Sequence, residues 1–226
     1  MSTLPPTLET IIPKDTSPES WIEHSVGGTQ HPWMDPRPFK GYTNAFIVRD
    51  GKILLGMKKR GFGIGKYDRS HFSIWTLDKW VRYGARSSSP VGFRLIQYPF
   101  NPGGKVEPEE SSRDAAIREM EEESGIRAPL EWAGTLLFFL EGVEKVFHCD
   151  VYRAETFEGE VVETEEMRPA WYSVDDIPYA QMWEDDPYWL PLLVAGTPFI
   201  GRADFDAKPG AEGEFVMRRW WVGKRE

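Results

Sequence analysis

The stretch GKVEPEESSRDAAIREMEEESGI, residues 104–126, is the most strongly patterned part of this 226-residue chain. Ser111 followed by Asp114 is a plausible capping box, and Gly125 is a typical helix stop. The stretch therefore predicts a helix that begins at Ser111 and ends near Ser124. Seven positions around this helix form a spaced motif: Gly104, Glu110, Arg118, Glu119, Glu122, Glu123 and Gly125. With usage of about one in fifteen per residue type, such a match arises by chance on the order of once in 10⁸ windows.

The glutamates of this helix have the spacing of a metal site. Residues three and four apart share a helix face, so Glu119, Glu122 and Glu123 project together. Clustered carboxylates repel one another unless a cation neutralises them, and oxygen-only ligands suit Mg²⁺, with Mn²⁺ as a substitute. Arg118 is placed to orient a glutamate through a bidentate contact, and the backbone at Gly103 can approach closely enough to offer a carbonyl ligand. An ordinary solvated acidic face is the simpler alternative for a bare run of glutamates, but it leaves the other motif positions unexplained.

Composition narrows the class of partner. The formal net charge of -9 argues against a nucleic-acid polymer, because phosphate backbones require a basic surface. An acidic protein can still bind a small polyphosphate when a divalent metal lies between carboxylates and phosphates. Cys149 is the only cysteine, which excludes an intramolecular disulfide and favours a reducing compartment. No apolar run is long enough to span a membrane, and residues 1–17 resemble no secretory or mitochondrial leader, so we expect a cytoplasmic protein.

The remaining pattern predicts one mixed α/β domain over residues 41–226. Residues 1–40 are rich in proline, threonine, serine and glycine, and we expect a flexible or loosely docked extension there. Asp50-Gly51 between two apolar runs predicts a β-hairpin. Asp186 and Pro187 offer an N-cap and a first-turn proline for a second helix that ends near Val194. The expected strands are 43–49, 52–55, 132–140, 145–154 and a last one around 216–220.

Several residues outside the motif are candidates for holding a planar base. Phe62, Phe138 and Trp183 can stack on such a group, although each aromatic taken alone is more often part of a core. Asp185 and Asp186 form a carboxylate pair that, if partly buried, keeps one proton and can both donate to and accept from a purine edge. The competing interpretation, that Asp186 only caps a helix, is equally well supported by the sequence.

The motif at Gly104–Ile126 matches the Nudix box at every fixed position. Three further stretches resemble the eukaryotic MutT homologues, the oxidized purine nucleoside triphosphate hydrolase branch of that family: residues 53–63, 166–169 and 182–193. The resemblance runs from about Gly41 to the C-terminus. The resemblance implies a Nudix α/β/α sandwich with a mixed central sheet. It also implies that the protein hydrolyses 8-oxo-dGTP and 2-hydroxy-dATP to the monophosphate and pyrophosphate.

The resemblance also implies residue roles. The catalytic group comprises Arg118, Glu119, Glu122 and Glu123. The metal ligands are the carbonyl of Gly103 and the carboxylates of Glu119, Glu122, Glu123 and Glu166. The substrate contacts are Thr43, Lys58, Phe62, Asn101, Phe138, Trp183, Asp185 and Asp186. The small-molecule partner is then a nucleoside triphosphate, and we expect a monomer in the cytoplasm, with the nucleus as a second compartment.

The match to this branch is interrupted before the Gly103-Gly104 pair. About thirty residues, roughly 68–99, lie where the family runs almost directly onward. Asn101 is the nearest candidate for the base-contacting asparagine of the family, although counting back from Gly103 places Phe100 at that position. The segment is either a surface loop, since long insertions cost little closure entropy, or translated intron, which its unpatterned sequence favours slightly.

Two other functions remain open at this point. One is Nudix hydrolysis of another substrate, such as a dinucleoside polyphosphate or ADP-ribose, which the Trp183-Asp185-Asp186 group disfavours. The other is an inactive Nudix-fold binding protein whose pocket the additional segment blocks. The complete set of glutamates argues against a binding protein, because such a module does not need the full set of metal ligands.

Overall fold

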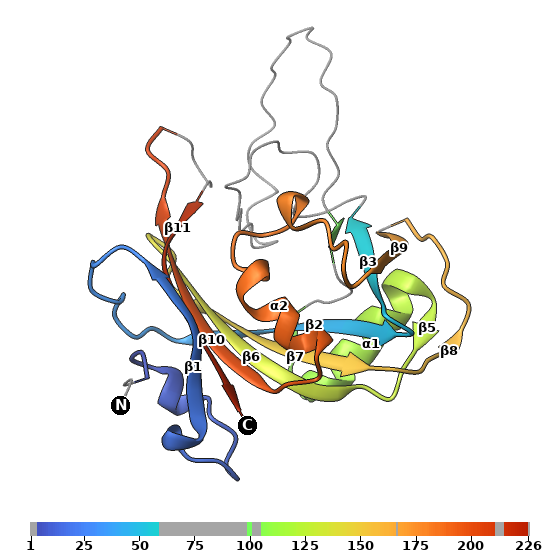
Figure 1. Ribbon diagram of the computed structural model, residues 1–226, viewed down its shortest axis with the longest axis horizontal. Helices are drawn as coiled ribbons and strands as arrows, with labels where there is room; N and C mark the ends of the chain where they lie inside the picture. The colour runs from blue at the N-terminus through green and yellow to red at the C-terminus, as the bar shows by residue number, and fades with distance from the viewer. Residues whose placement is uncertain (1–3, 59–98, 101–104, 166, 211–214, 226) are drawn as a thin grey trace, which may run out of the picture.

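The computed structural model describes residues 4–58, 99–100, 105–165, 167–210 and 215–225. A nine-stranded mixed sheet forms the centre of the molecule (Figure 1). Its strands are ordered β1-β11-β10-β6-β7-β2-β3-β4, and β9 also pairs with β3. The strand bounds are β1 Trp21–Gly28, β2 Phe39–Arg49, β3 Lys52–Lys58, β4 Pro99–Phe100, β6 Glu131–Leu140, β7 Val146–Ala154, β9 Met167–Ser173, β10 Phe199–Ala207 and β11 Phe215–Arg225.

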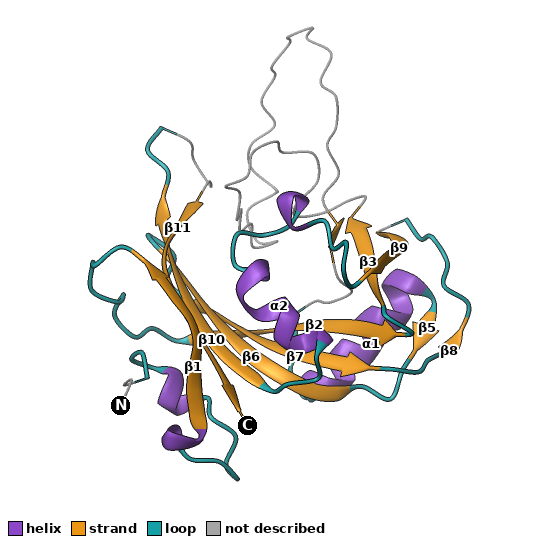
Figure 2. Ribbon diagram, viewed as in Figure 1, coloured by secondary structure: helices purple, strands orange, loops and turns teal. Residues whose placement is uncertain are grey.

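Two helices lie on opposite faces of this sheet (Figure 2). Helix α1, Ser112–Ser124, buries Ala116 and Met120 against one face. Helix α2, Asp186–Val194, buries Trp189, Leu190 and Leu193 against the other. The α/β/α sandwich with a mixed sheet is thus confirmed. A small second sheet pairs β5, Ile126–Arg127, with β8, Glu158–Gly159. In the part of the chain that the structure describes, short 3₁₀ helices span Leu8–Thr10, Pro18–Ser20 and Tyr179–Gln181.

The local sequence signals correctly predicted a turn and several strands. Asp50 and Gly51 both adopt positive φ, 52° and 69°, in the turn between β2 and β3, as the hairpin motif predicts. The strands expected around 43–55, 132–154 and 216–220 are present as β2, β3, β6, β7 and β11. Asp186 is the first residue of α2, and Asp185 is the N-cap. The carboxylate of Asp186 accepts a hydrogen bond from the backbone N–H of Trp183 at 3.0 Å.

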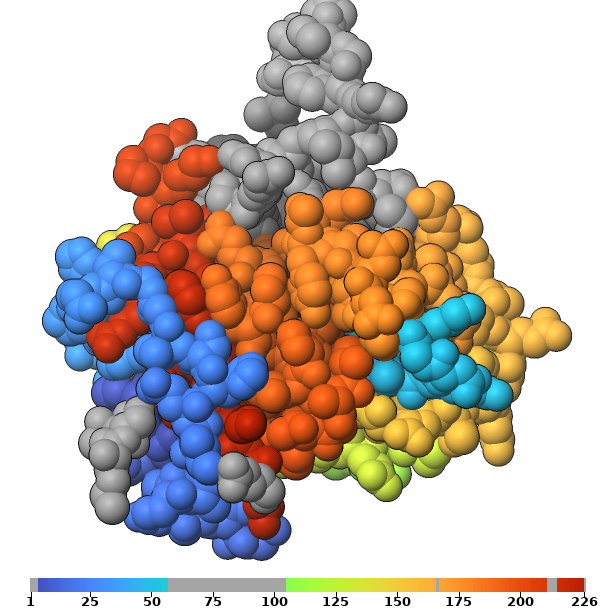
Figure 3. All heavy atoms as spheres, in the orientation of Figure 1, coloured from blue at the N-terminus to red at the C-terminus, as the bar shows by residue number. Residues whose placement is uncertain are grey.

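The N-terminal segment differs from the flexible extension expected for residues 1–40. Its strand β1 pairs antiparallel with β11, from Trp21 opposite Arg225 to Gly28 opposite Arg219. Leu8 and Trp21 are buried in an apolar cluster with Phe139, Ile200 and other residues of the central sheet. This cluster covers a part of the α1-side face that α1 does not reach, and the N-terminal segment lies beside strand β11 on the surface (Figure 3). The segment is ordered because it buries apolar area that the sheet otherwise exposes.

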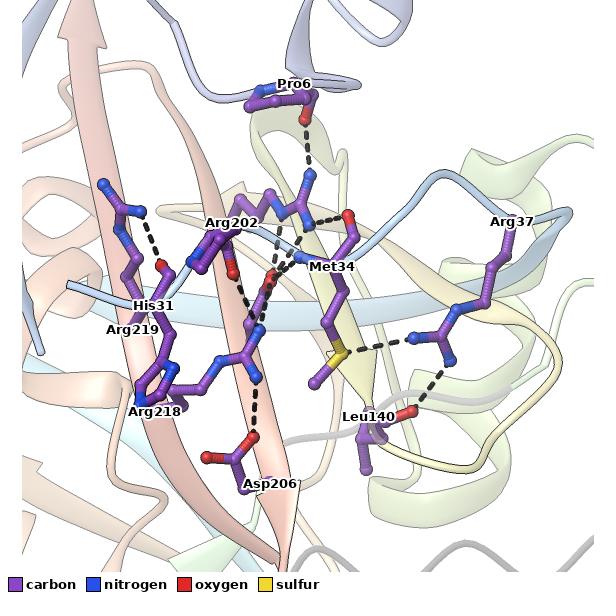
Figure 4. A network of polar contacts seen from close by, with 11 residues as sticks. Pro6, His31, Met34, Arg37, Leu140, Arg202, Asp206, Arg218 and Arg219 are labelled. Atoms are coloured by element: carbon purple, nitrogen blue, oxygen red, sulfur yellow. Dashed lines mark hydrogen bonds and ion pairs between the residues drawn. The ribbon is translucent and has the colours of Figure 1, made fainter. Parts of the chain in front are cut away.

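A buried ion pair also fastens this segment (Figure 4). Arg202 and Asp204 of β10 have fully buried side chains and are joined by two hydrogen bonds of 2.8 and 3.0 Å. Arg202 also donates to the carbonyl oxygens of Pro6 and Met34, each at 2.7 Å, and Asp204 accepts from the backbone N–H of Met34 at 2.6 Å. The guanidinium of Arg202 lies over the ring of Trp33. The N-terminal segment therefore supplies the carbonyl oxygens that a buried guanidinium requires.

Candidate active site

Helix α1 fixes the direction in which its acidic residues point. The hydroxyl of Ser111 accepts from the backbone N–H of Asp114 at 3.1 Å, which starts the helix as predicted. Gly125 ends it in the left-handed region at φ 75°, and a Cβ there would meet Val162 at 2.6 Å. The cap and the stop confirm the predicted helix. Because its apolar residues pack on the sheet, the glutamates occupy the remaining faces.

Arg118 is the centre of a charge network on this helix. Its guanidinium donates to Glu110 at 2.8 and 3.2 Å, to Glu119 at 2.8 Å and to Glu122 at 3.4 Å. It also donates to the backbone carbonyl of Lys105 at 3.4 Å, and Lys105 forms an isolated β-bridge with Tyr42 of β2. This hydrogen bond links the helix to the segment that precedes it. The hydrogen bond from Arg118 lowers the pKa of Glu110, and the same contact raises the pKa of Arg118. The sequence assigned Arg118 this orienting role, but it did not identify Glu110 as the partner that anchors it.

The three glutamates differ in exposure. The side chain of Glu119 is 16% exposed and that of Glu122 is 59% exposed, whereas Glu123 is buried at 3%. Thr164 donates its hydroxyl to the backbone carbonyl of Glu123 at 3.0 Å, so the segment before β9 is held against the C-terminal turn of α1. The predicted ligand Glu166 follows two residues later and lies outside the described residues.

These carboxylates are chemically suited to a divalent ion, although they are not gathered around a centre. Among the residues that the structure describes, no three acidic, histidine or cysteine side chains are close enough to hold a metal ion. Arg118 binds both Glu119 and Glu122, so its guanidinium supplies the positive charge between them. Glu122 is exposed and Glu119 is largely shielded from solvent. Oxygen-only ligands of this kind match the preference of hard divalent cations. Gly103, the predicted carbonyl ligand, is outside the described residues.

A second group of acids lies at the start of α2, on the opposite face of the sheet. Asp185 and Asp186 are both buried, at 6% and 5% exposure. Asp185 accepts a hydrogen bond from the indole N–H of Trp189 at 2.9 Å. Burial raises the pKa of Asp185 to about 6, and burial together with the neighbouring charge of Asp185 raises the pKa of Asp186 well above its ordinary value. The pair therefore retains a proton more readily than exposed carboxylates do, as the carboxylate-pair interpretation requires.

Apolar and aromatic side chains surround this pair. Phe138 of β6 is 8% exposed, packs against Phe205 and lies in the same core cluster as α2, and Trp183 is half-buried just before the helix. A small hollow, part of it open to solvent, adjoins Asp185. Its lining comprises Leu136, Phe138, Asp185, Tyr188, Trp189, Arg202, Ala203, Trp220 and Val222. Trp189, four residues after Asp185, was not singled out from the sequence, and only the i, i+4 helical spacing could have indicated it.

Not every predicted contact joins this group. Thr43 is buried and pairs with Asp150, which accepts a hydrogen bond from Ser112 of α1. Because side chains alternate along a strand, the side chain of Thr43 lies on the α1 face, away from Asp185 and Asp186. Lys58 is the last residue of β3 and pairs with Met167. Phe62 and Asn101 lie outside the described residues.

The chain is similar to known proteins in sequence and in fold. The chain is 36% identical over 164 residues to the oxidized purine nucleoside triphosphate hydrolase of zebrafish, Danio rerio, covering 72% of this chain and 85% of that protein. It is 34% identical over 165 residues to the mouse protein of the same name, covering 73% and 85%. A solved MutT protein from Bacillus halodurans superposes with a TM-score of 0.56 at 20% identity, over 81% of this chain and 97% of that one, which supports the fold.

A family model describes the same region. The NUDIX domain matches residues 74–193, more than half of the chain, including the whole of α1 and the Asp185-Asp186 pair. Proteins of this family generally use divalent metal ions and act on small nucleotide substrates. Within the described ranges, neither helix has the length and apolarity needed to cross a lipid bilayer. The motif, the sandwich fold and the matched domain together show that this chain belongs to the Nudix family of hydrolases.

Proposed function

We propose that this protein hydrolyses oxidised purine nucleoside triphosphates, 8-oxo-dGTP and 2-hydroxy-dATP, to the monophosphate and pyrophosphate. The observation that carries the proposal is the buried carboxylate pair Asp185-Asp186, which lies beside aromatic residues and whose pKa values are raised by burial. A pair that shares a proton offers one donor and one acceptor to a base edge, which a fully ionised pair does not. The similarity to the zebrafish and mouse hydrolases supports the same substrate class.

The phosphate chain is expected on the α1 side of the site. Glu119, Glu122 and Glu123 would hold Mg²⁺, with Mn²⁺ as a substitute, and Gly103 and Glu166 would complete its ligands. When bound, such an ion neutralises phosphate charge and lowers the pKa of a coordinated water. Arg118 has a positioning role: it donates to Glu119 and Glu122 and is itself held by Glu110. Trp183 and Phe138 would stack on or enclose the base while Asp185 and Asp186 hydrogen-bond its edge. Thr43, Lys58, Phe62 and Asn101 remain proposed contacts.

The test is pyrophosphate release from a nucleotide panel at pH 7 with Mg²⁺. The panel contains 8-oxo-dGTP, 2-hydroxy-dATP, dGTP, dATP and ADP-ribose. We expect kcat/KM for the two oxidised purines to exceed that for dGTP and dATP, and EDTA to abolish turnover. Equal turnover of 8-oxo-dGTP and dGTP, or faster cleavage of ADP-ribose, would contradict the proposed substrate.

Two accompanying properties belong to the same proposal. We expect a monomer, to be checked by light scattering on the purified chain, and a cytoplasmic location with a nuclear fraction, to be checked by imaging a C-terminally tagged protein. A version lacking residues 68–99 should be assayed beside the full chain, because this comparison shows whether that segment limits access to the site. Sequencing the transcript across residues 67–100 separates a retained segment from translated intron.

A further inference from the structure

One polar side chain on the base-facing side of the sheet has no role in the site described so far. Asn44 lies in β2 between Tyr42 and Phe46. Tyr42 and Phe46 both pack in the core cluster beneath α2, whereas Ala45 packs beneath α1. Because side chains of a strand alternate between its faces, Asn44 projects to the α2 face, the face that carries Asp185 and Asp186.

The neighbours of Asn44 connect it, on the same face of the sheet, to the carboxylate pair. Phe46, the next residue on the same face, packs edge-on against Trp189, with ring centroids 5.7 Å apart, and Trp189 donates to Asp185. On the adjacent strand, Asn44 pairs with Val151, and Tyr42 pairs with Cys149. Burial raises the pKa of the Cys149 thiol, and the charges of Asp150, Asp185 and Asp186 add to this effect. Asn44 therefore neighbours Phe46, which packs on Trp189, and lies diagonally across from Cys149 on the same face of the sheet.

An amide at this place requires a partner. The other side chains of the cluster on this face are overwhelmingly apolar, and Asn44 is half-buried among them. Within the described ranges, no hydrogen bond or ion pair of the Asn44 side chain is present. A base that covers this amide removes it from water, and a hydrogen bond between the amide and the base offsets that loss. The hydrogen-bonding capacity of an amide, with donors on nitrogen and an acceptor oxygen, is fixed, unlike that of a carboxylate pair.

We propose that Asn44 is a specificity-determining residue whose side-chain amide hydrogen-bonds the purine base held by Asp185 and Asp186. The inference rests on the proposed function and extends it by adding a third polar group to base recognition. Tyr42, stacked on Phe147 with centroids 4.9 Å apart, forms the apolar wall next to this amide. The base would thus meet carboxylates from α2 and an amide from β2, at two separate parts of its edge.

The experiment compares Asn44→Leu, which has a similar size but no polar group, and Asn44→Asp, which keeps an acceptor but lacks the N–H donors. Steady-state kinetics are measured with 8-oxo-dGTP, 2-hydroxy-dATP and dGTP. For Asn44→Leu we expect KM for 8-oxo-dGTP to rise about five- to hundredfold with kcat nearly unchanged, because one hydrogen bond in the bound state is lost. The kcat/KM ratio of 8-oxo-dGTP to 2-hydroxy-dATP should also change, since the two bases present donors and acceptors in different places.

Lys52→Leu is the matched control, because Lys52 is an exposed residue at the hairpin end of the neighbouring strand β3. It should leave all kinetic constants unchanged. Binding of 8-oxo-dGMP, measured by calorimetry, gives a second readout that is independent of turnover and of metal. A folded Asn44→Leu protein with unchanged KM, substrate ratio and 8-oxo-dGMP affinity would overturn the role of Asn44 alone. A wild-type protein without preference for oxidised purines would overturn the proposed function, and the role of Asn44 with it.

Discussion

Removing the carboxylate of Asp204 tests how strongly the N-terminal segment depends on the buried ion pair. In Asp204→Leu the guanidinium of Arg202, fully buried, loses two hydrogen bonds and its closest counter-charge, and retains the carbonyls of Pro6 and Met34. Burial already lowers the pKa of Arg202, and Asp204 opposes that effect. Breaking one side of such a pair costs about 3–5 kcal/mol, a large part of the roughly 5–15 kcal/mol that stabilises a typical domain.

The measurement is urea unfolding at pH 7 followed by tryptophan fluorescence, with limited proteolysis as a second probe. We expect the free energy of unfolding of Asp204→Leu to fall by the stated amount, and cleavage to appear first within residues 4–38. The double variant Arg202→Met/Asp204→Leu should recover most of the loss, because an apolar pair needs no compensation. A loss below about 1 kcal/mol in the single variant, or a double variant as unstable as the single, would refute this reasoning.

Three further outcomes follow from the site. Glu122→Gln should reduce kcat by at least about a hundredfold while leaving the melting temperature unchanged, since Glu122 is largely exposed; retained turnover would contradict the metal assignment. Arg118→Lys should lower kcat/KM roughly tenfold by losing the two-pronged contact with Glu110, and circular dichroism should show an intact helix. The raised pKa of Asp185 means that its contribution to stability is complete below about pH 4 and is lost as the pH rises through about 6. Unfolding at pH 4, 5, 6 and 7 should show this decline in the parent and a smaller one in Asp185→Asn.

The parts of the fold that depend on neighbouring residues in sequence were predictable. The helix α1 is defined by Ser111 and Gly125, and the β2–β3 turn by Asp50 and Gly51. Both signals act within a few residues, so no tertiary information is needed. The same holds for Arg118, whose contacts with Glu119 and Glu122 lie within one helical turn.

The strands at the edge and centre of the sheet were missed for a different reason. Strand β1 contains His24, Ser25 and paired glycines, and its order comes from pairing with β11 at the other end of the chain. Strand β10 places Arg202 and Asp204 at fully buried positions, which interrupts the alternation that identifies a half-buried strand. Their mutual neutralisation is a three-dimensional property that hydrophobic periodicity does not record.

The sequence predicted part of the candidate site, as it did part of the fold. The sequence left Asp186 balanced between a cap and a proton-sharing pair, and burial of both acids beside Trp189 favours the pair. Thr43 stays a proposed substrate contact, and the alternation of β2 places its side chain on the α1 face, the side where the phosphate chain is expected. The same alternation, once known, identifies Asn44 on the other face, where sequence reasoning had assigned no residue of β2.

The pairing of β1 with β11 also determines when this protein can finish folding. Trp21 lies opposite Arg225, so the two strands that meet were synthesised at opposite ends of translation. A growing chain holds Leu8 and Trp21 without their apolar partners Ile200 and Trp221 until the last strand leaves the ribosome. Contacts of such long sequence separation form slowly, and exposed apolar segments of this kind promote aggregation.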